Sequence, residues 1–157
     1  MALIIRPFNN NDAPKIALLL KRNFLEINSN DYPLVQMHKL TAEYTPEKIS
    51  TQAIFGHTYV AEINDTLVGT GTICPFWNSQ TESIILSLFV QPEFHGQGIG
   101  SAIMKYLEQD EFYLRANRIE VPASRTAKEF YLHLGYQLKH AEGIEDENGY
   151  IRMEKRC

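Results

Sequence analysis

The feature that most limits how this 157-residue chain can fold is an apolar strand that leads into a glycine-rich turn and then a helix. A strand is predicted over residues 82–90, because alternate positions from Ile84 to Val90 are apolar and give one almost wholly apolar face. Such a strand belongs in the centre of a sheet, where other elements cover it. The chain therefore needs a layered fold in which helices pack on a sheet.

The other elements alternate between strand and helix patterns along the chain. Turn-forming residues separate short β-branched runs from stretches with apolar residues at helical spacing. The predicted strands are residues 3–7, 57–62, 66–73, 82–90, 118–122, 136–138 and 150–153, and the predicted helices are residues 12–28, 45–55, 99–107 and 124–134. This order predicts one α/β (α+β) domain over residues 1–157, with a mixed sheet flanked by helices on both faces.

Composition excludes several classes of protein. With 44% hydrophobic and 22% charged residues the chain is typical of a globular domain, and no apolar run approaches the roughly 20 residues that cross a bilayer. A net charge of −4 argues against a nucleic-acid partner, and Cys74 and Cys157 have the spacing of neither a metal site nor a disulfide framework. We therefore expect a cytoplasmic protein with no membrane partner, no nucleic-acid partner and no metal.

Gly96, Gly98 and Gly100 interrupt the turn that follows the central strand. Glycine permits positive φ, and the first amides of a helix have no intrahelical partners and lie at its positive dipole end. This arrangement suits a pyrophosphate. A dinucleotide-binding motif follows the first strand of its domain and has its third glycine one residue later than this turn does. A P-loop requires a Gly-Lys-Ser/Thr triplet, which the sequence lacks. The pyrophosphate of coenzyme A is the remaining option.

Two segments of the chain, residues 88–100 around the glycine-rich turn and residues 124–136 spanning the last predicted helix, resemble the signature motifs of the GNAT family of acetyl-CoA-dependent N-acetyltransferases. Residues 88–100, Leu-Phe-Val-Gln-Pro-Glu-Phe-His-Gly-Gln-Gly-Ile-Gly, are similar to the family's acyl-CoA-binding motif. Residues 124–136 are similar to its second motif, in which an alanine precedes an aromatic-Tyr pair and then Leu-Gly-aromatic. The order of elements matches over essentially the whole chain.

The resemblance implies a GNAT-like acyl-CoA N-acyltransferase fold with a mostly antiparallel sheet. It implies acetyl-CoA as co-substrate and direct attack on its thioester by a primary amine of a small molecule or peptide. Such domains often pair through sheet edges, so a homodimer is a further expectation.

The same resemblance implies which residues form the cofactor site and the proton donor. The residues expected to bind the cofactor are Leu88, Phe89, Val90, His95, Gly96, Gln97, Gly98, Ile99, Gly100, Ser101 and Ser124. His95 stands where the family usually has Gln or Arg, and Ser124 where it usually has Asn. Tyr131 matches the family tyrosine that protonates the leaving thiolate; the alternative is a core aromatic packed beside Phe130.

The general base cannot be assigned from the sequence. The family's base is often a Glu on the central strand, and that position aligns with Ile84. Glu82, two residues earlier on the same face, could act through a water, or it could be a solvated charge at the strand end. His38 and His57 are weaker candidates. The missing Glu leaves open a non-catalytic acyl-CoA-binding sensor or regulatory module.

The acceptor site is expected between the first two predicted helices and the central hairpin. Acids and aromatics there would suit a cationic amine, although the loop could equally be an ordinary solvated one. The residues in question are Asn28, Asp31, Tyr32, Glu43 and Tyr44, with Trp77 as a lid or a sheet-edge cover. Arg125 and Lys128 could meet the nucleotide's phosphates or remain solvated.

Overall fold

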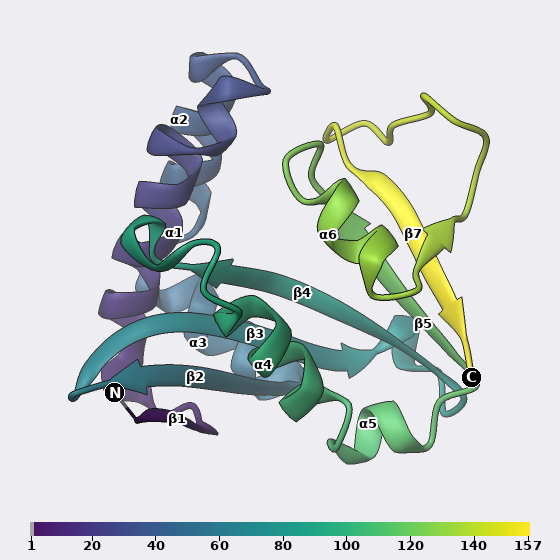
Figure 1. Ribbon diagram of the computed structural model, residues 1–157, viewed down its shortest axis with the longest axis horizontal. Helices are drawn as coiled ribbons and strands as arrows, with labels where there is room; N and C mark the ends of the chain where they lie inside the picture. Colours follow the sequence, from purple (N-terminus) through teal and green to yellow (C-terminus); the bar gives the residue numbers. More distant parts are fainter. Residues whose placement is uncertain (1) are drawn as a thin grey trace.

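The computed structural model describes residues 2–157, and a seven-stranded sheet runs through its centre (Figure 1). Across the sheet the strands lie in the order β1-β2-β3-β4-β5-β7-β6. They are β1 (Leu3–Pro7), β2 (His57–Ile63), β3 (Thr66–Pro75), β4 (Glu82–Val90), β5 (Arg118–Ala123), β6 (Gln137–Leu138) and β7 (Ile151–Arg156). Within residues 2–157 only β4 and β5 pair in parallel, and every other pair is antiparallel. This confirms the mixed, mostly antiparallel sheet.

Helices cover both faces of the sheet, as the sequence predicts (Figure 1). They are α1 (Ala13–Glu26), α2 (Leu34–Glu43), α3 (Pro46–Phe55), α4 (Ile99–Leu107), α5 (Glu111–Leu114) and α6 (Lys128–His133). On one face Leu19 and Phe24 of α1 are buried against Val60 of β2. On the other face Ile103 of α4 is buried against Ile85 of β4, and α5 and α6 pack on the same core. None of the helices in residues 2–157 has the length and apolar character needed to cross a bilayer.

Local signals explain where α3 begins and why α2, which like the short α5 is absent from the predicted helices, is not revealed by the sequence. The Thr45 side chain accepts a hydrogen bond from the amide of Lys48 at 3.2 Å and starts α3 at the predicted place. Helix α2 is not predicted, because Leu34 and Val35 point to solvent and only Met37 is fully buried, so its apolar residues do not follow one face.

A bulge in β4 divides the apolar face that the alternation predicts. Ser87 has φ +54°, and the register between β3 and β4 shifts beside it. An extra residue at a bulge reverses which side chains face which layer. Ile85 therefore packs in the core under α4 before the bulge, whereas Leu88 packs against that core after it and Phe89 packs against α1. The prediction of one continuous face from Ile84 to Val90 is wrong for this reason.

The sheet opens between β4 and β5. These strands pair only from Glu82 to Ile84, opposite Arg118 to Glu120, and beyond Ile84 they diverge (Figure 1). The rest of the β4 edge that faces β5 pairs with no strand of the described residues. Backbone groups left unpaired at an edge need another partner, so this opening is the natural place for a ligand.

Candidate active site

A cleft of about 890 Å³ fills the opening between β4 and β5. Its lining includes residues 84–90 of β4, the turn before α4, and parts of α1 and α6. Because the two strands separate, the cleft connects the face covered by α1–α3 with the face covered by α4 and α6. A cavity of this size falls in the range that holds a cofactor-sized ligand.

The turn before α4 presents unbonded amides to this cleft. Gly96 and Gly98 have φ of +78° and +82°, and a Cβ on either would meet nothing within 4 Å, so the left-handed backbone rather than space favours glycine. The amide of Ala102 makes the first bond of the helix, to the Gly98 carbonyl at 3.0 Å. The amides of residues 96–101 donate to no group within residues 2–157. They form a row of donors at the positive end of α4.

Gly100 allows close packing of α4 on α6, and His95 forms a hydrogen bond between the turn and β4. A Cβ on Gly100 would lie 3.3 Å from the Phe130 ring, so the absent side chain lets α4 approach α6 closely. The His95 Nε2 atom donates to the Val90 carbonyl at 2.7 Å, and the Asn23 side chain donates to the same oxygen at 2.9 Å. The imidazole therefore fastens the turn to the end of β4, whereas the sequence predicts that it contacts a phosphate.

Tyr131 is buried among aromatic rings and also forms part of the cleft wall. Its side chain is 5% exposed and lines the cleft, and the hydroxyl bonds to no group within residues 2–157. Its ring lies edge-on to Phe130 and Tyr136, with centroids 5.2 and 5.8 Å away. Burial raises the pKa of the Tyr131 phenol above its usual value, which keeps the hydroxyl protonated. The core-aromatic role and the proton-donor role are thus compatible.

Most of the other predicted cofactor residues lie along the same wall. Leu88, Phe89, Val90, Ile99, Ser101 and Ser124 all line the cleft. The Ser124 hydroxyl accepts a hydrogen bond from the amide of Ala127 at 3.1 Å and turns the chain into α6. The helix begins at Lys128, later than predicted, because residues 124–127 form this turn. Gln97 points away from the cleft and donates to the Glu93 carbonyl at 3.3 Å.

The candidate bases lie outside the cleft. The Glu82 carboxylate accepts hydrogen bonds from Arg118 at 3.0 and 3.3 Å, and the hydrogen bond from Arg118 lowers the pKa of Glu82. Glu82 sits at the paired end of β4 and β5 and is not part of the cleft lining. His38 is exposed on α2, and His57 bonds Asp110 at 2.8 Å beside a separate cavity of about 470 Å³.

The predicted acceptor residues divide into two groups. Asn28, Tyr44 and Trp77 line the cleft, although Trp77 is 87% exposed and stands at its rim with φ +48°. Asp31 and Glu43 do not line it. The described residues that line the cleft include no Asp, Glu or Lys, so the acids expected to bind a cationic amine are not part of this lining.

Tyr32 and Arg125 are engaged in holding loops together. The Tyr32 hydroxyl donates to the Gly149 carbonyl at 2.7 Å and accepts from the Arg125 amide at 2.8 Å. The Arg125 guanidinium makes a fork to Glu145 at 2.6 and 2.8 Å and lies over the Tyr32 ring. Asp31 accepts from Thr126 at 2.7 Å in the same cluster. The Tyr32 hydroxyl proton is therefore already used within the protein, and Tyr32 does not line the cleft.

Lys128 is likewise occupied, because its amino group pairs with the exposed carboxylate of Glu142. Neither Lys128 nor Arg125 lines the cleft.

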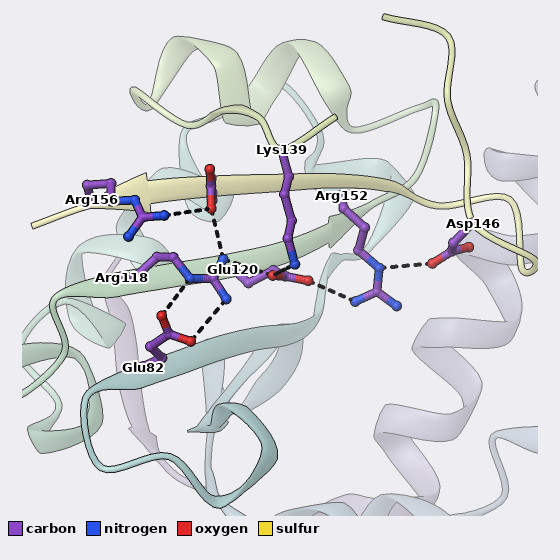
Figure 2. Close-up of polar contacts among 8 residues, drawn as sticks. Glu82, Arg118, Glu120, Lys139, Asp146, Arg152 and Arg156 are labelled. Atoms are coloured by element: carbon purple, nitrogen blue, oxygen red, sulfur yellow. Dashed lines mark hydrogen bonds and ion pairs between the residues drawn. The ribbon is translucent and has the colours of Figure 1, made fainter. Parts of the chain in front are cut away.

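A charged network covers the strands on the far side of the opening (Figure 2). The Glu120 carboxylate, 1% exposed, accepts hydrogen bonds from Lys139 at 2.7 Å, Arg118 at 2.9 Å and Arg152 at 3.3 Å. Arg152 also donates from Nε to Asp146 at 3.0 Å. Burial by itself would raise the pKa of Glu120, but the hydrogen bonds from Lys139 and Arg118 outweigh it and lower that pKa. Glu120 is therefore an anion shared by three cations.

Arg152 is the member of this network that lines the cleft, and the sequence analysis missed it. Arg152 lies on β7 and pairs with Pro122 of β5. Pro122 is two residues after Glu120, the last residue of β5 that pairs with β4. Only the β5–β7 register brings it there, and no local motif signals it. Within residues 2–157, no three His, Cys, Asp or Glu side chains gather in a way that could hold a metal ion.

Comparisons with known proteins agree with this geometry. A family model described as an acetyltransferase (GNAT) domain matches residues 55–138. The uncharacterized N-acetyltransferase YafP of Escherichia coli (strain K12) is 31% identical over an alignment of 113 residues, and the match covers 65% of this chain and 67% of YafP.

Two solved structures share the fold at low sequence identity. The PaiA N-acetyltransferase of Thermoplasma acidophilum, solved in complex with coenzyme A, has a TM-score of 0.85 at 17% identity over 100% of both chains. A GNAT-family N-acetyltransferase structure from Rhodopseudomonas palustris has a TM-score of 0.80 at 20% identity, covering 100% of this chain and 97% of the other.

Proposed function

The chain belongs to the GNAT family of acetyltransferases, and from that premise we propose that its cleft binds acetyl-CoA and transfers the acetyl group to a primary amine of a small molecule or peptide. One observation carries the proposal: the unbonded amides of residues 96–101 and the unpartnered Tyr131 hydroxyl open into the same cleft. We assign the whole chain to one such domain.

The amides of the turn supply what a diphosphate needs. Several N–H donors converge at the N-terminus of α4, whose dipole favours a negative charge by about 0.3–1 kcal/mol, and up to ~2 where the site is partly buried. His95 is bonded to the Val90 carbonyl, and Arg152 on β7 is the one Lys or Arg among the described residues that line the cleft, so the backbone would hold the phosphates. The unpaired edge of β4 past Ile84 gives the pantetheine amides backbone partners.

The chemistry follows from that placement. The acceptor nitrogen attacks the thioester carbonyl carbon, and the negative charge that develops on the oxygen is stabilised by backbone amides of Leu88, Phe89 or Val90. The attacking nitrogen gives up one proton to water, the C–S bond breaks, and the leaving thiolate takes the proton of the Tyr131 hydroxyl, giving an N-acetyl product and free coenzyme A. The tyrosinate regains a proton from solvent.

The amine loses its own proton to water in this scheme. Glu82 is held by Arg118 outside the cleft, and no carboxylate of the described residues lines it. The fraction of acceptor that arrives uncharged therefore limits the rate, and turnover is expected to rise with pH toward the acceptor's own pKa.

The test is acetyl-CoA-dependent release of thiol against a panel of amines, read together with the protein's melting temperature. We expect acetyl-CoA to raise the melting temperature, and thiol to appear only when a suitable amine is present. Tight acetyl-CoA binding without turnover of any amine would favour a non-catalytic acyl-CoA-binding module. An unmoved melting temperature would remove the cofactor assignment itself.

A further inference from the structure

We infer that the acceptor amine carries a carboxylate, and that the guanidinium of Arg152 binds this carboxylate on the α1–α3 side of the cleft. The inference rests on the proposed function, because it names the acceptor class for the same cleft.

The first support is the charge of the acceptor side. Among the described residues that line the cleft, Arg152 is the one side chain with a permanent charge, and no acidic group is present to pair with a second ammonium. The other acceptor-side walls are aromatic or neutral, formed by Tyr44, Phe76, Trp77 and Tyr150. A polycationic acceptor would meet a guanidinium there and no carboxylate in the lining, whereas an apolar amine with one anionic group would find a partner.

The second support is the geometry of Arg152 (Figure 2). Its Nε donates to Asp146 at 3.0 Å and its Nη1 donates to Glu120 at 3.3 Å, so the plane of the fork is fixed from two sides. Its Nη2 donates to no group within residues 2–157, and Figure 2 shows it projecting away from both carboxylates. A pre-oriented guanidinium with a free edge is the arrangement that recognises a carboxylate.

The third support is that Arg152 stays accessible although it is paired. Asp146 and Glu120 both form ion pairs with it, and Glu120 also serves Arg118 and Lys139. Arg152 nevertheless keeps a side-chain exposure of 30% and lines the cleft. A carboxylate on the acceptor would bind as a further anion at the Nη2 edge, which neither Asp146 nor Glu120 uses.

Together these features describe an acceptor class. The carboxylate lies at Arg152, and an aliphatic or aromatic side chain contacts Tyr44 or Phe76. The amine faces the opening of the sheet between β4 and β5, where the thioester would lie. The class is therefore an amino acid, or a short peptide with its C-terminal carboxylate, that bears an apolar side chain.

The test compares matched acceptors in the wild type and in Arg152→Gln. The acceptors are L-phenylalanine, L-phenylalaninamide and 2-phenylethylamine, with equivalent triplets built on leucine and methionine. For the carboxylate member we expect Arg152→Gln to lower kcat/KM by about 10- to 100-fold, the usual effect of losing a charged hydrogen bond. For the two members without a carboxylate we expect little change. Comparing wild type with variant on the same acceptor cancels differences in amine pKa.

Two further variants separate recognition from general effects. Arg156→Gln removes the same charge from the same strand at a side chain that is 72% exposed and outside the cleft lining, and should leave the selectivity unchanged. Arg152→Lys keeps the charge but loses the fork, and should restore part of the preference for the carboxylate. Melting temperatures confirm that each variant is folded.

An equal loss of kcat/KM for all three members of a triplet would overturn the inference, as would wild-type turnover of carboxylate-free amines alone. Either result leaves the proposed function intact. A wild type that releases thiol with no amine at all refutes the proposed function as well.

Discussion

Backbone groups form the cofactor side of the cleft, whereas side chains form the acceptor side. The cofactor side is backbone: the amides of residues 96–101 and the free edge of β4 come from one continuous stretch of chain, with Tyr131 as the main polar side chain. The acceptor side is made of side chains from distant segments, including Asn28 on the 3₁₀ turn after α1, Phe76 after β3 and Arg152 on β7.

This difference teaches which changes each side tolerates. A backbone site depends on φ, ψ and on the helix that follows, so an unusual residue such as His95 or Ser124 is accommodated when it fastens the turn or starts a helix. A side-chain site depends on each group and on what holds it, as Glu120 and Asp146 hold Arg152.

The largest expected effect is a loss of turnover without a loss of acetyl-CoA binding. Tyr131→Phe keeps the ring that packs on Phe130 and Tyr136 but removes the hydroxyl, so turnover should fall by about 10²–10⁴-fold while acetyl-CoA affinity stays nearly constant. Turnover is followed by thiol release and affinity by calorimetry. Tyr136→Phe is the matched control, because Tyr136 is as deeply buried but does not line the cleft. Equal turnover in wild type and Tyr131→Phe would remove the assigned role.

The next effect tests the dependence of the acceptor side on charge. Glu120→Gln takes away the anion shared by three cations and should cost about 3 kcal/mol of unfolding free energy, the low end for breaking a buried pair because Arg118 keeps Glu82 and Glu154. Urea denaturation measures the loss. Glu142→Gln, at an exposed pair with Lys128, should cost less than about 1 kcal/mol.

Glu120→Gln should also change how the unfolding free energy depends on pH in the acid range. The pKa of Glu120 is lowered in the folded state, so its contribution is present above its unfolded pKa of about 4.5 and is lost as the pH falls through the folded value. Wild type should therefore lose more unfolding free energy than Glu120→Gln between about pH 5 and pH 3. Parallel pH profiles for the two proteins would contradict the lowered pKa.

The smallest effect concerns backbone conformation. Gly98→Ala places an alanine at φ +82°, a left-handed position that costs about 1–2 kcal/mol, so we expect the backbone to relax and to turn the amides away from the cleft. Acetyl-CoA affinity should fall by about tenfold. Gly143→Ala is the control, because Gly143 also has positive φ and open space around it but lies in the loop before β7. A similar loss of affinity in both variants would show that general destabilisation, not the turn, is responsible.

The cofactor side could be predicted from the sequence because its residues are contiguous, whereas the acceptor side depends on residues that are far apart in the chain. Periodicity and the Thr45 cap predicted the strands and most helices, and a contiguous motif located the cofactor side. The partners of Glu82 and Tyr32 lie 36 and 93 residues away in the chain, so their engagement by Arg118 and Arg125 could not be read locally. Arg152 likewise depends on the register between β5 and β7.

The most direct measurement of the central claim is a titration of ¹⁵N-labelled protein with coenzyme A, followed by amide NMR. The backbone amides of Gly96, Gly98, Gly100 and Ser101 should shift and saturate together with those of Leu88 to Val90. Omitting the diphosphate, by titrating with pantetheine, should leave residues 96–101 unmoved while the β4 amides still respond. Saturable binding of coenzyme A that shifts amides elsewhere and leaves residues 96–101 unchanged would contradict a diphosphate site at the start of α4.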